Sequence, residues 1–194
     1  MEQVVKPKKW RKPVIIILAA LFILAAAARI AVEIMAAHNT FIFCGGRIIN
    51  DGLQFALDCL LGAVVIAAVI CFSRYLPVKI TLVAICVIVL FFVYLFNSGL
   101  FDPYAYSTYY QFTSPNQKIV VVEERPVWFD SVFFIYQKTG DFTLQMMDGN
   151  GSTKYPTGPF SDNDYQLTWS DDAVTVTYKY DSGIEKSETF QFVK

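Results

Sequence analysis

The sequence predicts a membrane α-helical region followed by an all-β domain: three transmembrane helices, then a small antiparallel meander that forms a sandwich or an open barrel. Three apolar runs in the first half predict the helices. Charge divides the chain at the same place, because residues 1–97 hold nine Lys and Arg against four Asp and Glu, whereas residues 98–194 hold seven against thirteen. Short strand-like segments between turn residues predict the β-domain.

The three apolar runs occupy residues 14–37, 53–72 and about 78–97. A helix rises 1.5 Å per residue, so about 20 residues cross a hydrocarbon core that is about 30 Å thick. Buried helices of a soluble protein would need amphipathic partner helices to cover them, and the sequence predicts none. The first run is longer than the apolar core of a signal peptide and has no convincing cleavage site, so we interpret it as a retained signal anchor.

Basic residues in the short loops predict the orientation. Residues 1–13 form a basic tail with five Lys and Arg, and two further basic residues flank the turn between the second and third helices. The segment between the first two helices, residues 38–52, holds a single Lys or Arg, which is Arg47. The positive-inside rule therefore places the N-terminus in the cytoplasm. Three crossings then make residues 98–194 an extracytoplasmic β-domain of a multi-pass protein in the cell membrane.

The second half of the chain alternates short strands with turns. We expect strands at residues 118–124, 132–138, 142–147, 165–169, 174–180 and 187–193. Apolar and polar side chains alternate most clearly over 174–180, which is typical of a strand with one buried face. Because the gaps between neighbouring strands are short, the pattern favours an antiparallel meander around one modest core.

Two turn motifs of the second half carry a resemblance. Residues 114–118 (Ser-Pro-Asn-Gln-Lys) are similar to a turn of β-propeller blades, but the domain is too short for four blades of four strands. Together with residues 169–172 (Trp-Ser-Asp-Asp) and the membrane helices, this turn resembles small membrane proteins of Firmicutes that carry a C-terminal β-domain. The resemblance implies a bacterial cell-envelope protein and brings no enzymatic activity with it.

The inventory of reactive residues argues against catalysis. His38 is the only histidine, and all four cysteines precede the β-domain, at positions 44, 59, 71 and 86. The β-domain therefore lacks the groups of Ser-His-Asp and Cys-His catalysis and of the usual zinc sites. Its paired aspartates lie in turn sequences, where Asp caps the backbone. We expect no enzyme, no cofactor and no metal site, and a disulfide between Cys44 and Cys59 stays open.

Besides Lys79 at the start of the third run, three charged residues fall inside the predicted helices. Arg29 and Asp58 lie at matching depths, each roughly 8 Å below the outer surface of a hydrocarbon core of ~30 Å. Glu33 follows Arg29 by one helical turn on the same face, which gives a second pairing. Charges in lipid are costly and usually face a bundle interior or a polar cavity. We interpret Arg29, Asp58 and Glu33 as a structural charge cluster, with an ion or proton path as the alternative.

The leading hypothesis is a non-enzymatic membrane anchor that presents a small binding, sensing or accessory β-domain. Its expected partners are the lipid bilayer and a protein, peptide or cell-wall component, and we expect no nucleic acid. An exposed strand edge, or the aromatic residues Trp128 and Phe129, would provide the partner surface. The alternative is a membrane-embedded subunit of a transporter or other membrane complex, in which the β-domain is a cap.

Overall fold

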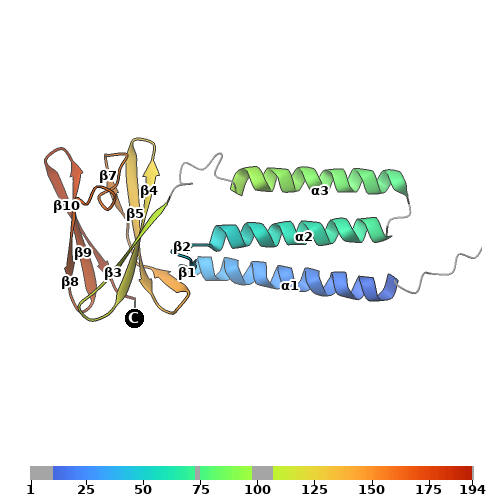
Figure 1. Ribbon diagram of the computed structural model, residues 1–194, viewed down its shortest axis with the longest axis horizontal. Coiled ribbons are helices and arrows are strands. Elements are labelled where there is room, and N and C mark those ends of the chain that lie inside the picture. Colours follow the sequence, from blue (N-terminus) through green and yellow to red (C-terminus); the bar gives the residue numbers. More distant parts are fainter. Residues whose placement is uncertain (1–10, 73–74, 98–106, 194) are drawn as a thin grey trace, which may run out of the picture. The chain divides into compact units, whose positions relative to one another are not determined.

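The computed structural model describes residues 11–72, 75–97 and 107–193, and Figure 1 shows its labelled elements. The chain divides into two compact units. The helical unit comprises Met1–Ile34 and Asp51–Asn97, and the β unit comprises Met35–Asn50 and Ser98–Lys194. Most of the basic tail on which the predicted orientation rests (residues 1–10) and residues 98–106 lie outside the described residues.

Three helices make up the helical unit: α1 (Arg11–Ala37), α2 (Asn50–Phe72) and α3 (Leu76–Asn97). They end where the apolar runs predict and begin two or three residues earlier. In Figure 1, α2 lies between α1 and α3. A glycine permits close approach on one side of α2, because a Cβ at Gly62 would lie only 2.8 Å from a methyl carbon of Leu90 in α3.

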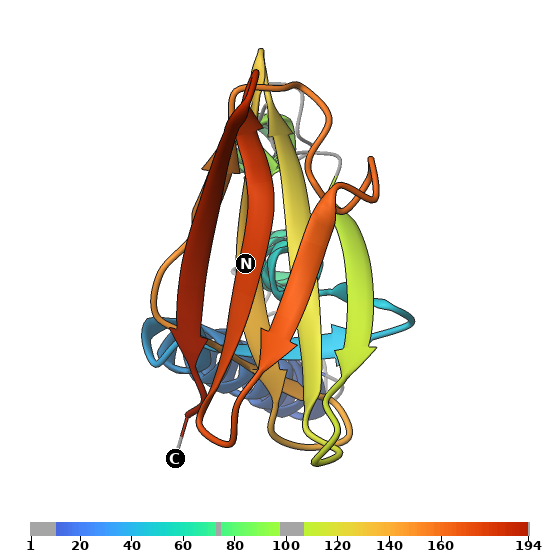
Figure 2. The same ribbon diagram turned by 90° about the vertical axis from the view of Figure 1, so that its left-hand side faces the viewer.

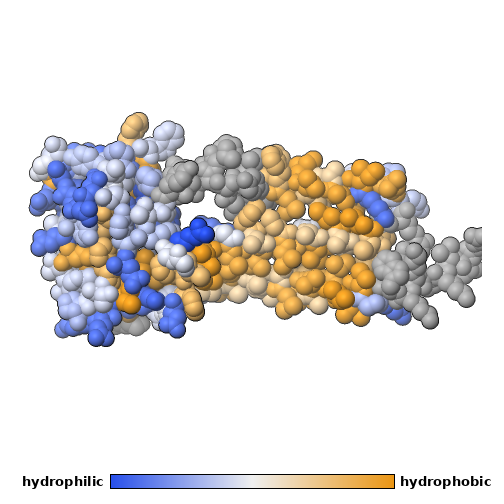
Figure 3. All heavy atoms as spheres, in the orientation of Figure 1, coloured by the Kyte–Doolittle hydropathy of each residue, from blue (hydrophilic) through white to orange (hydrophobic). Residues whose placement is uncertain are grey.

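The helices carry their apolar side chains outward. Both α1 and α2 are long and apolar enough to span a membrane, and only 6% of the apolar window of each is buried inside the chain. The apolar stretch of α3 within the described side chains, Lys79–Phe92, is shorter. Figure 3 shows this apolar surface in orange. Such an exposed apolar surface is stable only in an apolar solvent or against apolar partners.

The β unit consists of two antiparallel sheets. The larger sheet has the order β2-β1-β6-β5-β4-β3, with β7 paired to β5, and the smaller sheet has the order β10-β9-β8. The strands are β1 (Thr40–Cys44), β2 (Arg47–Ile48), β3 (Thr108–Thr113), β4 (Ile119–Val127), β5 (Asp130–Lys138), β6 (Thr143–Met146), β7 (Gly151–Thr153), β8 (Tyr165–Trp169), β9 (Ala173–Asp181) and β10 (Ile184–Gln191). The predicted combination of apolar helices with an all-β domain is confirmed.

The main core lies between the two sheets, which face each other in Figure 2 with β8, β9 and β10 in front. Alternate residues of each sheet fill it, among them Val120, Val122, Phe133 and Ile135 from one and Val174, Val176, Tyr178 and Phe190 from the other. Phe160, from the segment between β7 and β8, is 1% exposed and enters the same core. Its ring lies 5.3 Å from that of Phe133 and 4.5 Å from that of Tyr165.

The segment between α1 and α2 forms a β-hairpin that belongs to the β unit. The apolar runs predict that residues 38–52 belong to the helical region, and this prediction is wrong for residues 38–50. Strand β1 pairs with β6, so that Phe41 lies opposite Leu144. The hairpin turns at Gly45 and Gly46, whose φ angles are 62° and 82°. Two positive φ angles define the type I′ turn, for which Gly-Gly is a preferred sequence.

A second, smaller core forms where this hairpin meets the larger sheet. Val121, Tyr136 and Leu144 are buried there, and Phe41, Phe43 and Ile48 of the hairpin pack against them. The ring of Phe41 meets that of Tyr136 edge-on at 5.5 Å. The ring of Phe43 lies 6.3 Å from that of Tyr109 in β3. Strand β1 pairs with β6 near one end of the larger sheet, and its Phe43 contacts Tyr109 of β3 at the other end. The larger sheet therefore curls until it nearly closes around the second core.

Candidate functional site

The three ionisable residues predicted within the helices meet in the helical unit. Arg29 Nε of α1 donates a hydrogen bond of 3.2 Å to Asp58 Oδ1 of α2. Arg29 Nη1 donates to Glu33 Oε2, one helical turn further along α1. The side chains of Arg29, Asp58 and Glu33 are 27%, 33% and 64% exposed. The cluster is therefore open on one side, where its polar atoms can meet lipid head groups, water or a partner.

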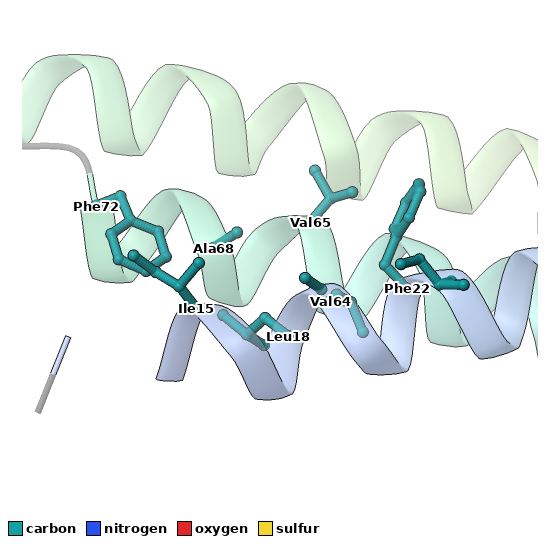
Figure 4. Close-up of a pocket in the computed structure, with 9 residues that line it drawn as sticks. Ile15, Leu18, Phe22, Val64, Val65, Ala68 and Phe72 are labelled. Carbon is teal, nitrogen blue, oxygen red and sulfur yellow. The ribbon is translucent and has the colours of Figure 1, made fainter. Parts of the chain in front are cut away.

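Two grooves run along α2. The groove between α1 and α2 has a volume of about 310 Å³ and is lined only by apolar side chains, including Ile15, Phe22 and Phe72. Figure 4 shows these side chains at the boundary of the two helices. The groove between α2 and α3 has a volume of about 470 Å³, and Asp58 is the one charged residue that lines it. The charge cluster thus borders a groove that is otherwise apolar.

A buried carboxylate anchors the second core of the β unit. Glu123 of β4 is 1% exposed. Its Oε1 accepts a 2.9 Å hydrogen bond from the Tyr109 hydroxyl, and its Oε2 accepts bonds of 2.7 Å from the Tyr136 hydroxyl and 2.9 Å from Arg125 Nη2. Arg125 also lies over the ring of Phe134, with its guanidinium carbon 5.0 Å from the ring centre. These contacts satisfy the carboxylate from within the β unit.

The electrostatics of this network follow from its geometry. Burial alone raises the pKa of Glu123, but the hydrogen bonds from Arg125 and Tyr136 and the charge of Arg125 outweigh burial and hold the pKa below its usual value of 4.5. Burial and the adjacent Glu123 carboxylate raise the pKa of both Tyr109 and Tyr136. At neutral pH the network therefore contains a carboxylate, a guanidinium and two neutral phenols. Glu123 is buried, and its hydrogen bonds come from side chains of the same unit, which is typical of a structural network.

The neighbouring carboxylate, Glu124, points to the opposite face of β4, as alternation along a strand requires. It accepts 3.0 Å hydrogen bonds from the backbone N–H groups of Phe160 and Ser161 and a further bond from the Ser161 hydroxyl. Gly158 lies against it, since a Cβ at that position would be 1.7 Å from Glu124 Oε1. Glu124 thus fixes the segment that inserts Phe160 into the main core.

The predicted aromatic pair lies at the tip of the β4–β5 hairpin. Val127 pairs with Asp130, so Trp128 and Phe129 form a two-residue turn. Both side chains are 80% exposed. Trp128 has a φ of 54°, in the left-handed region. A positive φ at the first turn position favours glycine, and a bulky residue there is an outlier. We call Trp128 and Phe129 the aromatic tip.

Sequence reasoning missed both buried glutamates, although the sequence carried a signal for them. Glu123 and Glu124 interrupt the apolar run Ile119–Val127 at its centre, where a strand with two covered faces tolerates a charge only if it is paired. The partners Tyr109, Tyr136 and Ser161 are distant in sequence. Which residues would satisfy the charges therefore depends on the register of the strands.

Comparisons of the chain with protein-family models, with curated proteins and with solved structures found no match. Among the residues that the structure describes, no three side chains of the metal-ligating types converge. The four cysteines are free thiols, with Cys44 exposed on the β1–β2 hairpin. The candidate sites are thus the charge cluster of the helical unit and the aromatic tip of the β unit.

Proposed function

We propose that this chain is a non-enzymatic protein of a bacterial cell envelope, in which three transmembrane helices anchor an extracytoplasmic β unit that binds a partner. The N-terminus lies in the cytoplasm in this proposal. Support for the anchor comes from the outward-facing apolar surfaces of α1 and α2, which bury only 6% of their apolar windows. The partner is a protein, a peptide or a cell-wall component with an apolar pocket.

The pairing of β1 with β6 supports three crossings. Paired strands lie on the same side of a membrane, and the chain passes through α2 and α3 between β1 and β6. If α2 crosses the membrane, α3 must cross it in the opposite direction for these strands to meet. The 22 residues of α3 would measure about 33 Å, enough for a core of about 30 Å. The strand pairing thus supports the third span independently of hydropathy.

The observation that carries the binding role is the aromatic tip. Two-residue hairpin turns normally hold Gly, Asn or Asp, as Gly45-Gly46 does in the β1–β2 hairpin. At the aromatic tip, two large side chains take these positions, and exposure of 80% leaves them almost no packing to offset the left-handed backbone of Trp128. Sites that break a local rule without an internal gain are expected to be functional. Trp is also the residue type most enriched among binding hot spots.

The test replaces the tip by a turn that folds at least as well. Trp128→Gly with Phe129→Asn supplies a glycine at the positive-φ position. The intact protein and this variant are purified from the native host in mild detergent, and co-purifying molecules are quantified. We expect the variant to lose at least about tenfold of a specific partner, as loss of a hot spot predicts. Phe142→Ser, at another exposed aromatic (63% exposed), is the matched control. Equal recovery by wild type and the tip variant would contradict the proposal.

A second candidate function rests on the charge cluster. Arg29, Asp58 and Glu33 meet in the helical unit, and Asp58 borders the groove between α2 and α3. Ionisable residues within membrane helices commonly mark ion paths or contacts with partner helices. In this alternative, the chain is a membrane-embedded subunit whose helices perform the function. A stable Arg29→Leu, Asp58→Leu variant that loses the partner or phenotype, while the tip variant keeps it, would favour this alternative.

A further inference from the structure

Among the described strands of the β unit, β10 is the longest that lies at the edge of a sheet. It lies at the end of the three-stranded sheet, next to β9 only. It has eight residues, against two, six and five in the edge strands β2, β3 and β8. Its first four residues are exposed. A long, uncovered edge exposes backbone N–H and C=O groups that can pair with another strand.

The side chains of β10 divide cleanly between the two faces of the sheet. Ser187 and Thr189 lie on the outer face, where their hydroxyls bond those of Thr177 and Thr175 on β9 at 2.8 and 2.9 Å. Lys186, Glu188 and Phe190 point toward the core side, opposite Tyr178, Val176 and Val174. Phe190 is buried, Glu188 is half-buried, and Lys186 is exposed. The core side of this edge therefore carries one cation and one anion, two residues apart.

Neither charge is neutralised within its own chain. Lys186 Nζ lies 3.6 Å from the centre of the Tyr180 ring, and Glu188 Oε1 accepts only a long bond of 3.4 Å from the Tyr178 hydroxyl. Among the described residues, no ion pair includes Lys186 or Glu188. An antiparallel copy of the same edge would place an anion opposite the cation and a cation opposite the anion.

We propose that two copies of this chain associate through β10, which pairs antiparallel with β10 of the second copy to form one continuous six-stranded sheet. The two-fold axis passes between the two Ser187 residues. Lys186 of each copy then lies opposite Glu188 of the other, so the pairing makes two ion pairs related by symmetry. An interface that uses the same patch on both subunits is the commonest form of protein self-association.

Charge selects this register among the alternatives. In paired strands, directly opposed residues share a face of the sheet. A two-fold axis perpendicular to the sheet therefore places one residue of β10 opposite the same residue of the second copy. An axis at Lys186 would oppose two cations, and an axis at Glu188 would oppose two anions; like charges directly opposite each other destabilise a sheet. The axis at Ser187 alone pairs opposite charges. The competing explanation is that inward-pointing charges keep this edge from pairing at all.

Charge reversal separates the two explanations. The oligomeric state of the intact protein is measured by sedimentation in detergent. Lys186→Glu alone, or Glu188→Lys alone, should weaken the dimer about tenfold or more, because each creates two like-charge pairs. Combining both changes restores opposite charges across the interface and should restore the dimer. A monomeric wild type, or a double variant that stays as weak as the single ones, would overturn the proposal.

Cross-linking then tests the register. In a full-length chain whose four cysteines are replaced, Ser187→Cys should form an intermolecular disulfide in membranes, since opposed Cα atoms lie about 4.5–5.5 Å apart, within disulfide range. Glu185→Cys alone should not, but copies with Glu185→Cys mixed with copies with Thr189→Cys should. Thr177→Cys is the control, because three strand spacings separate the two copies by about 14 Å there. Cross-linking of Glu185→Cys with itself, or none at Ser187→Cys, would overturn this register.

Discussion

The two units of this chain each hold an arginine beside a carboxylate, and the surroundings of the two pairs differ. In the β unit, Glu123 is 1% exposed and accepts hydrogen bonds from Arg125 and two tyrosines of the same unit. In the helical unit, Arg29 is 27% exposed, and its partners Asp58 and Glu33 are more exposed still. In the β unit the carboxylate is enclosed by the fold and only the arginine is partly exposed, whereas in the helical unit the arginine and both carboxylates are partly or fully exposed.

This difference follows from how each unit excludes solvent. The β unit buries apolar side chains between its sheets and under the β1–β2 hairpin, so its interior provides its own low-polarity environment. The helical unit turns its apolar side chains outward. The energetics of its charge cluster are then set by the bilayer or partner around it. We expect the stability that the Glu123 network provides to be the same in detergent and in lipid. The stability that the Arg29 cluster provides should depend on what surrounds the helices.

The largest expected effect is the loss of the enclosed carboxylate. Glu123→Ala leaves the Arg125 charge and two buried hydroxyls without their acceptor, and breaking one member of a buried pair costs about 3–5 kcal/mol. Urea unfolding of the full chain in detergent measures the change in free energy of unfolding, with Trp10 and Trp128 replaced by Phe so that the fluorescence comes from Trp169 in β8. Glu185→Ala, at an exposed site, should stay within about 0.5 kcal/mol. A loss below about 1 kcal/mol for Glu123→Ala would mean that the network does not hold the second core together.

The same network predicts how stability varies with pH. Because the folded pKa of Glu123 is below 4.5, its carboxylate stabilises the β unit fully above pH 4.5, and this contribution is lost as the pH falls through the lower folded pKa. Glu123→Gln removes the group that titrates. As the pH falls below 4.5, the free energy of unfolding should therefore decrease more steeply for wild type than for Glu123→Gln. Parallel profiles for the two proteins would contradict the assigned cause.

The second effect concerns the open cluster. Asp58→Leu should cost about 2–3 kcal/mol, less than for a fully buried pair, because the side chains are partly exposed and Glu33 still neutralises Arg29. Arg29→Leu should cost more, since it leaves two carboxylates together. Arg29→Leu combined with Asp58→Leu should recover part of the loss. Thermal unfolding in lipid nanodiscs and in detergent measures these changes. Strictly additive losses would show that Arg29 and Asp58 do not depend on each other.

The third effect tests whether the β1–β2 hairpin contributes to the stability of the β unit. Phe41 lies between two helices in sequence and packs on Tyr136 in the second core. Phe41→Ala should destabilise the β unit by about 2 kcal/mol, less than for a fully buried Phe because its side chain is only half-buried. Urea unfolding followed at Trp169 is again the measurement. Ile23→Ala, an exposed apolar site of α1, is the control and should leave the unfolding of the β unit unchanged.

Local patterns in the sequence predicted most of the fold, and contacts between distant segments account for what they missed. Apolar runs predicted all three helices, because length and hydropathy are local properties. They did not predict the β1–β2 hairpin, although the sequence Phe41–Cys44, then Gly-Gly, then Arg47–Ile49 carries a hairpin signal. The hairpin lies between two helices, and its pairing partner β6 follows about a hundred residues later.

For the candidate sites, too, local patterns predicted some features, and contacts between distant segments determine the others. The depths of Arg29 and Asp58 along their helices follow from helical rise, so the sequence alone predicts their pairing. Trp128 and Phe129 were chosen as aromatic residues after a proline. That they form a two-residue turn follows only from the pairing of Val127 with Asp130. Glu123 was missed because its tyrosine partners belong to other strands.

The smallest effect has the opposite sign. Trp128→Gly should stabilise the β unit by about 1 kcal/mol, because glycine adopts a positive φ without the cost that other residues carry. A gain of stability combined with loss of the partner is expected where a residue is kept for function. Urea unfolding measures the gain, with Phe129→Ser as the control that keeps the Trp128 backbone. A clear loss of stability would mean that the Trp128 side chain packs within its own unit.

The most direct test of the account is the sidedness of Cys44 and Ser152, since β1 and the rest of the β unit must share one side of the membrane. Three proteins are compared in intact cells: one retaining only Cys44, and two cysteine-free variants carrying Ser152→Cys or Gln3→Cys. A membrane-impermeant maleimide should label position 44, which is exposed, and position 152, which is partly exposed, and should miss position 3. Labelling of positions 44 and 152 from opposite sides would contradict the strand pairing and the three-crossing anchor together.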